Sequence, residues 1–131
     1  MTLIEATVQA SDTLTVDKMA GTGQSIKAVA ATSSSTVEAK LSDSSGSSDA
    51  MTFELKGAAN AASIADGAKL KTTDIETVTV KVSSYAESID LSDLSMATSG
   101  KTMSLVVTGD KALTVSALNA DVTTIDASGM G

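Results

Sequence analysis

The sequence predicts an all-β fold: a β-solenoid-like stack of short strands that includes an antiparallel hairpin region. Apolar and polar residues alternate with period two along almost the whole chain, and turns rich in Ser, Asp and Gly separate the alternating stretches. The chain has one Phe, one Tyr and no Trp, so small aliphatic side chains must form a thin core. A β-sandwich is the alternative, although sandwich cores usually contain Trp or several Phe.

Residues 36–41 and 51–56 alternate most clearly, and the polar loop 42–49 separates them. We expect an antiparallel hairpin with one solvated face, on which Glu and Lys pair across the strands. A third strand is expected at residues 76–82. The predicted inward residues of these three strands are Val37, Ala39, Leu41, Met51, Phe53, Leu55, Val78, Val80 and Val82.

The chain is expected to form a single β-rich module with three regions: an antiparallel hairpin region at 1–57, an Ala-rich crossover at 58–72 and a β-repeat region at 73–131. The Ala residues of the crossover favour a helical turn. In the last region strand centres recur at steps of roughly ten residues, which suits tight hairpins or stacked β rungs. Shorter strands are expected at residues 3–8, 13–16, 26–31, 88–91, 103–108, 112–115 and 122–127.

The chain is acidic, with a formal net charge of −7, and all nine of its basic residues are Lys. Nucleic-acid binding requires a basic face and usually Arg, so no nucleic-acid partner is expected. An anionic membrane surface would repel the chain. No apolar stretch reaches the roughly 18 residues that a spanning helix needs, so no membrane insertion is expected.

The composition also argues against an enzyme. Without His or Cys, the chain lacks the commonest general base, thiol nucleophiles, and imidazole or thiolate metal ligands. Carboxylate pairs such as Asp90 with Asp93, or Asp121 with Asp126, could in principle hydrolyse glycosides. Such enzymes line their subsites with aromatic residues, and this chain has only two. We therefore expect a non-enzymatic protein.

Calcium is the one cofactor that the sequence indicates. Ca²⁺ binds six to eight oxygen atoms, and several aspartates follow predicted strands where they could line one edge of a stack. The alternative is that these residues cap turns and strand ends, as Asp commonly does. The candidate Ca²⁺ ligands are Asp90, Asp93, Asp110, Asp121 and Asp126.

Three segments carry a resemblance to a known group of proteins: DIETVTVKVSS at 74–84, MSLVVTGDKALTVSALNADVTTIDASGMG at 103–131 and, less closely, DTLTVDKMAG at 12–21. In order and spacing they resemble the β-strand repeat modules of bacterial S-layer proteins and RTX-type surface adhesins. Related repeats occur in phage virion proteins. The resemblance covers residues 75–131 and implies a non-enzymatic surface module that builds coats or adhesive stalks, often with Ca²⁺. The G-G-x-G-x-D calcium motif of true RTX repeats is absent.

Three functions remain. The first is a structural protein that self-assembles or docks with neighbouring subunits in a repetitive extracellular surface assembly, S-layer-like or stalk-like. The second is a phage virion structural protein, used for capsid decoration, the tail or a fibre. The third is a glycan- or receptor-binding adhesin domain. Residues 1–10 lack a Sec-type signal, which leaves a C-terminal export signal held elsewhere, a virion location or a fragment of a longer chain.

Overall fold

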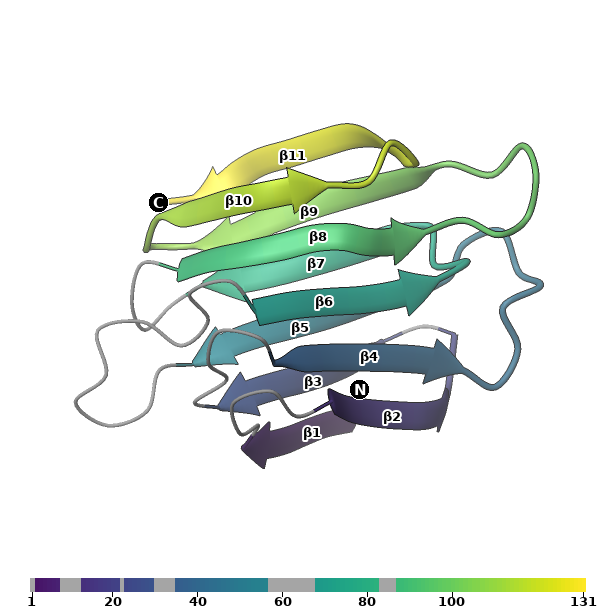
Figure 1. The fold of residues 1–131 in the computed structure, drawn as a ribbon, viewed down its shortest axis with the longest axis horizontal. Coiled ribbons are helices and arrows are strands. Elements are labelled where there is room, and N and C mark those ends of the chain that lie inside the picture. Colours follow the sequence, from purple (N-terminus) through teal and green to yellow (C-terminus); the bar gives the residue numbers. More distant parts are fainter. Residues whose placement is uncertain (1, 8–12, 22, 30–34, 57–67, 83–86) are drawn as a thin grey trace.

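A computed structural model describes residues 2–7, 13–21, 23–29, 35–56, 68–82 and 87–131, and in these residues the fold is all-β, without a helix (Figure 1). The strands are β1 (Thr2–Thr7), β2 (Thr13–Met19), β3 (Gln24–Val29), β4 (Thr36–Leu41), β5 (Ala50–Lys56), β6 (Ala68–Thr73), β7 (Thr77–Val82), β8 (Glu87–Ser95), β9 (Met103–Gly109), β10 (Leu113–Leu118) and β11 (Val122–Met130).

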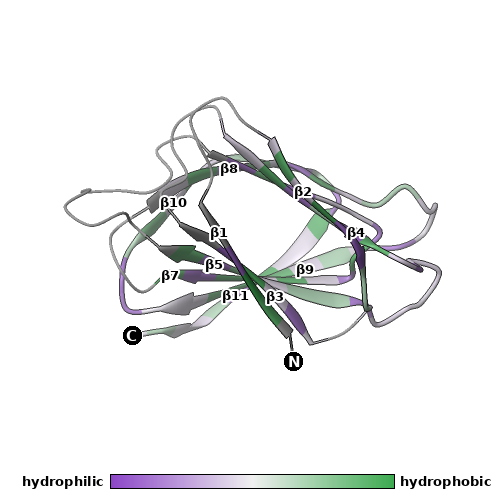
Figure 2. Cartoon of the chain, turned by 90° about the horizontal axis from the view of Figure 1, so that it is seen from below, coloured by the Kyte–Doolittle hydropathy of each residue, from purple (hydrophilic) through white to green (hydrophobic). Residues whose placement is uncertain are grey.

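These strands form two sheets, and each strand lies in the opposite sheet from the strand before it. The six-stranded sheet has the order β1-β3-β5-β7-β9-β11, and the five-stranded sheet has the order β10-β8-β6-β4-β2. Every pairing within either sheet is parallel. Figure 2 shows the two sheets as separate layers that enclose the core. The strands therefore stack from β1 and β2 at one end to β10 and β11 at the other (Figure 1).

The predicted antiparallel hairpin is wrong. β4 pairs with β2 and β6, whereas β5 pairs with β3 and β7 in the other sheet. A period-two pattern specifies which side chains face inward, but it does not specify the partner or direction of a strand. The 42–49 loop crosses between the sheets instead of closing a hairpin. All-parallel pairing also excludes the antiparallel β-sandwich, and the described residues form no closed solenoid.

Residues 68–72, expected in the crossover at 58–72, belong instead to β6, which pairs with β4 and β8. Residues 57–67, where the helical turn was expected, lie outside the described residues. Leu70 and Thr72 of β6 are both buried, whereas Lys69 and Lys71, which alternate with them, are partly exposed. The two-residue periodicity of this segment therefore predicts its structure better than helix propensity does.

The core lies between the sheets and is built from side chains in register. In the six-stranded sheet Ile26, Phe53 and Val80 pair across β3, β5 and β7, and each is fully buried. Parallel pairing without a register shift repeats one side-chain orientation on each successive strand, so apolar columns run along the stack. The predicted inward residues are buried, except for Leu41, which is half-buried.

Charged side chains form similar columns on the outer faces. Lys27 of β3 lies between Glu5 of β1, at 3.6 Å, and Glu54 of β5, at 3.9 Å. In the other sheet Glu38 of β4 lies 3.4 Å from Lys71 of β6. Opposite charges on adjacent strands favour this register and keep both outer faces polar. No helix of the described residues has the length and apolar character needed to cross a membrane.

Candidate functional site

Two features stand out: the open ends of the stack and a buried ionic cluster at the loops that precede β5, β7 and β9. Within the described residues, β1 and β11 are the edge strands of the six-stranded sheet, and β2 and β10 are those of the other. The outer edge of each of these strands carries N–H and C=O groups that pair with no strand in the described part of the chain. Such edges are the usual sites at which another β-strand adds to a sheet.

The end formed by β10 and β11 exposes apolar side chains that continue the core. Val115 is 36% exposed, Leu118 is 40% exposed and Ile125 is 56% exposed. Their in-register partners on the preceding strands are Ile89, Leu91 and Leu105 respectively, and all three partners are fully buried. At this end of the stack the apolar columns of the core therefore reach the surface.

The opposite end, formed by β1 and β2, has the same character. Ile4 pairs with the fully buried Ile26, and Leu14 pairs with Val37. Ile4 and Leu14 are only half-buried, because the described residues place no further strand beyond them. Leu3, which is 52% exposed, pairs with Ser25 on the outer face of the sheet and does not continue the core.

The ionic cluster joins three loops. Nζ of Lys101, in the loop before β9, lies 2.8 Å from Oε1 of Glu76, which immediately precedes β7. Glu76 Oε2 accepts a hydrogen bond from the backbone N–H of Asp49, which precedes β5, at 2.9 Å. Lys101 Nζ also donates to the backbone carbonyls of Ser44 (3.3 Å) and Gly46. Because β5, β7 and β9 are neighbouring parallel strands, the loops that enter them meet at one rim of the sheet.

Asp49 is the most unusual member of the cluster. It is 7% exposed, and its Oδ2 has no hydrogen-bond partner in the described part of the chain. A Cβ added to Gly21 would lie 2.4 Å from Asp49 Oδ1, and a Cβ added to Gly46 would lie 3.0 Å from both of its oxygens. The two glycines thus leave the space that the carboxyl group occupies. Burial raises the pKa of Asp49, and the nearby Glu76 carboxylate raises it further.

The other two carboxyl groups at this rim are held in the charged form. For Glu76, burial alone would raise the pKa, but hydrogen bonds from Lys101 and from the Asp49 N–H outweigh burial and lower it. Asp74 accepts hydrogen bonds from the backbone N–H of Thr98 at 2.9 Å and from its hydroxyl at 3.1 Å. The backbone hydrogen bond is the main reason why the pKa of Asp74 is lowered. Asp74 and Glu76 therefore both tie the β6–β7 turn to the β8–β9 loop.

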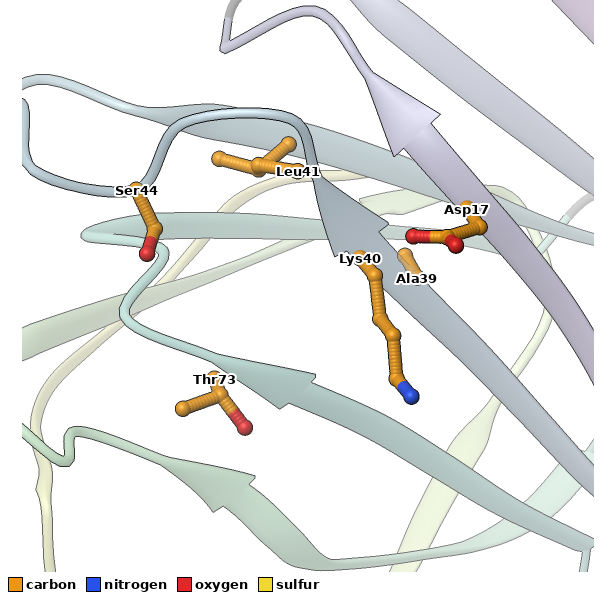
Figure 3. Close-up of a pocket in the computed structure, with 6 residues that line it drawn as sticks. All are labelled: Asp17, Ala39, Lys40, Leu41, Ser44 and Thr73. Carbon is orange, nitrogen blue, oxygen red and sulfur yellow. The ribbon is translucent and has the colours of Figure 1, made fainter.

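Two hollows lie near these loops. One, of about 360 Å³, lies beside the ionic cluster and is lined by Ser47, Glu76, Thr77, Lys101, Thr102 and Ser104. The other, of about 230 Å³, lies where β2, β4 and β6 end, and Figure 3 shows its lining residues Asp17, Ala39, Lys40, Leu41, Ser44 and Thr73. Both offer hydroxyl, carboxylate and ammonium groups that could hydrogen-bond a small polar ligand. Glu76 and Lys101 already bind each other, so the first hollow has fewer hydrogen-bonding groups available to a ligand.

The structure brings together only two of the five predicted calcium ligands. Asp90 and Asp93 of β8 lie 3.9 and 3.4 Å from Lys69 Nζ, so their charge is balanced by an ammonium group. Asp110 is balanced in the same way, because its Oδ2 lies 3.8 Å from Lys111 Nζ. Asp121 accepts the N–H of Met96, and within β11 Asp126 accepts the N–H of Ser128; hydrogen bonds from the side chain and backbone of Ser128 lower the pKa of Asp126. Among the described residues no three acidic side chains form a metal-binding group, and calcium stays a prediction.

No pattern in the sequence predicted the ionic cluster. Its charged members Asp49, Glu76 and Lys101 are separated by about 25 residues at each step, a spacing that becomes informative only once the parallel register is known. Comparison of the chain with protein-family models, with curated proteins and with solved structures finds no match. The resemblance to surface-layer and adhesin repeats therefore stays an expectation from the sequence.

Proposed function

We propose that this protein is a non-enzymatic structural subunit of a repetitive extracellular surface assembly, in which it binds copies of itself or neighbouring subunits. The open ends of the two sheets are the observation that carries this proposal. Both ends combine strand edges that no other described strand pairs with and apolar side chains that continue the buried core. Covering either end would satisfy backbone groups and bury apolar area in a single contact.

The distribution of lysine supports the same role. Proteins commonly protect edge strands with Lys or Pro, which oppose pairing with another chain. This chain has no Pro, and its strands β1, β10 and β11 contain no Lys. Of the interior strands, β3 to β7 each contain at least one Lys, whereas β8 and β9 contain none. These three edges thus lack the residues that normally oppose strand addition.

The ionic cluster has a supporting role in this proposal. It binds three loops at one rim of the stack through side chains that are largely buried, with exposed fractions of 14% for Glu76 and 19% for Lys101. Loops fixed in this way hold β5, β7 and β9 in one register. A stack with a fixed register presents the same two ends in every copy, which a repetitive assembly requires.

Negative-stain electron microscopy and light scattering of the purified chain over a concentration series, with and without Ca²⁺, test the proposal. We expect filaments or sheets that grow with protein concentration. A chain that stays monomeric under every condition would contradict a self-assembling role. If assembly occurs, a location of the gene among capsid and tail genes would assign it to a virion rather than a cell surface.

A further inference from the structure

We infer that the copies join head to tail, with the β10/β11 end of one copy docked on the β1/β2 end of the next. In this contact β1 of the incoming copy pairs with β11, and β2 pairs with β10. Both sheets then continue through the junction. This inference rests on the proposed function and names its partner, a second copy of this chain, and the geometry of the contact.

Strand direction is the first argument. Every pairing inside the molecule is parallel, and in Figure 1 the strands of one sheet point one way while those of the other sheet point the opposite way. Moving a copy along the stack by its own length brings β1 beside β11 and β2 beside β10, with both directions preserved. A two-fold contact between like ends would instead require antiparallel pairing in both sheets.

The presence of two edges at each end is the second argument. A partner that covers the β10/β11 end fully must offer two strands, separated by the distance between the sheets and pointing in opposite directions. The β1/β2 end of this chain has these two strands at that separation. A partner with one free strand could cover only half of the end.

The apolar columns are the third argument. The columns that finish at Val115, Leu118 and Ile125 lie on the inner faces of the two sheets, and so do those that begin at Ile4 and Leu14. Head-to-tail contact places one set over the other and extends the core across the junction. One kind of contact then covers both ends of every interior copy, whereas a two-fold dimer would leave one end of each copy open.

The pairing of β11 permits this addition. Its register with β9 shifts between Val122 and Thr124 and again between Asp126 and Gly129, but Thr124, Ile125 and Asp126 pair with three consecutive residues of β9. Bulges of this kind bend an edge locally and shorten the length available for pairing. The regular stretch contains Ile125, the most exposed large apolar side chain of the described residues. We therefore expect the junction in this sheet to centre on Ile125.

Two edge variants test the inference. Ile125→Lys places a charge on the β10/β11 end, and Ile4→Lys places one at the start of the inner apolar column of the β1/β2 end. Ile125 is more than half exposed and Ile4 is half-buried on an edge strand, so the fold should tolerate both changes, and circular dichroism checks this. Ser48→Lys, in an exposed loop, is the control for added charge. Light scattering and electron microscopy measure assembly of each variant alone and of the two edge variants mixed in equal amounts.

Head-to-tail contact predicts that each edge variant alone stays monomeric, because its intact end meets only blocked ends. The concentration needed for assembly should rise by about tenfold or more, while Ser48→Lys assembles like the parent chain. The equal mixture should form dimers and nothing longer, since one intact end of each kind remains.

Three other results would overturn the inference. If one edge variant dimerises alone and mixing adds nothing, like ends pair. If both edge variants assemble like the parent chain, the copies join through their faces, and the proposed structural function stands without this contact. If the parent chain never assembles, the proposed function falls together with the inference.

Discussion

Glu76 Oε1 lies 2.8 Å from Lys101 Nζ, and this ion pair joins the turn before β7 to the loop before β9. The same carboxylate accepts the backbone N–H of Asp49 through its second oxygen. One side chain thus serves the entry points of three neighbouring strands in one sheet. The stability of this rim and its dependence on pH follow from these few contacts.

Replacing Glu76 should destabilise the protein. Glu76→Ala leaves the Asp49 N–H without its acceptor and removes the carboxylate partner of Lys101, which keeps only backbone carbonyls, at a cost of about 2 kcal/mol. Asp110→Ala removes the partner of Lys111 in an exposed ion pair and should change stability by less than about 0.5 kcal/mol. Urea denaturation of both variants measures the difference. Equal effects would show that the Glu76 contacts stabilise the protein no more than an exposed ion pair does.

Asp49 should make the protein less stable as the pH rises. Because the pKa of Asp49 is raised in the folded state, its contribution is fully present below its ordinary value of 3.8 and is lost as the pH rises through the raised pKa. Asp49→Asn stays neutral, so its free energy of unfolding relative to the parent should increase across this interval. Denaturation curves at a series of pH values measure the effect. A difference that does not vary with pH would mean that Asp49 ionises as freely in the folded state as in the unfolded one.

Asp74 should show the opposite dependence. Its pKa is lowered by the hydrogen bonds from Thr98, so its contribution is present above 3.8 and is lost as the pH falls through the lowered pKa. Asp74→Asn should therefore be less stable than the parent near neutral pH, and the two should converge in acid. The same pH series checks this variant, and a gap that widens in acid would refute the assignment.

Phe53 should contribute more to stability than any exposed apolar residue. Its ring is fully buried between Ile26 and Val80 in the core column, so Phe53→Ala should cost about 3–5 kcal/mol. Ile125→Ala, at an exposed edge position, should cost less than about 1 kcal/mol when measured in dilute protein. Thermal or urea unfolding compares the two variants. Similar losses would contradict the placement of the core between the sheets.

Gly109, at the end of β9, should resist substitution because two constraints act there. Its φ is +120°, and an added Cβ would lie 1.9 Å from the carbonyl oxygen of Val82. Gly100 has a φ of +83° with open space around the added atom. Gly100→Ala should therefore cost about 1 kcal/mol, and Gly109→Ala several times more, since the backbone of β7 must also move. The free energies of unfolding of the two variants check this: Gly100→Ala measures the backbone strain alone, and Gly109→Ala measures the strain together with the clash with Val82.

The sequence predicted the inward side chains well and their partners poorly. Val37, Ala39, Met51, Phe53 and Leu55 were expected inside and are buried, because a pleated strand alternates its faces whatever its neighbours are. Their segments were expected to pair with each other, and they lie in different sheets. A loop such as 42–49 can return beside its own strand or cross to the other sheet, and the period-two pattern is the same in both cases.

The candidate site shows the same division. The aspartates chosen from their position near strand ends are spread over the molecule, and only Asp90 and Asp93 meet, at Lys69. The Asp49, Glu76 and Lys101 cluster depends on three loops that the parallel register brings to one rim. No local pattern connects those residues, so the sequence alone could not predict that they meet.

The sequence by itself determined an all-β protein with an aliphatic core, because side-chain alternation and the near absence of aromatic residues are local properties of the chain. Tertiary structure alone decided that consecutive strands alternate between two parallel sheets, that unlike strands form the two ends, and that one buried rim carries charge. Those features depend on pairing between residues far apart in the chain. The backbone N–H and C=O groups of one strand can pair almost equally well with many other strands, so local sequence does not specify the partner.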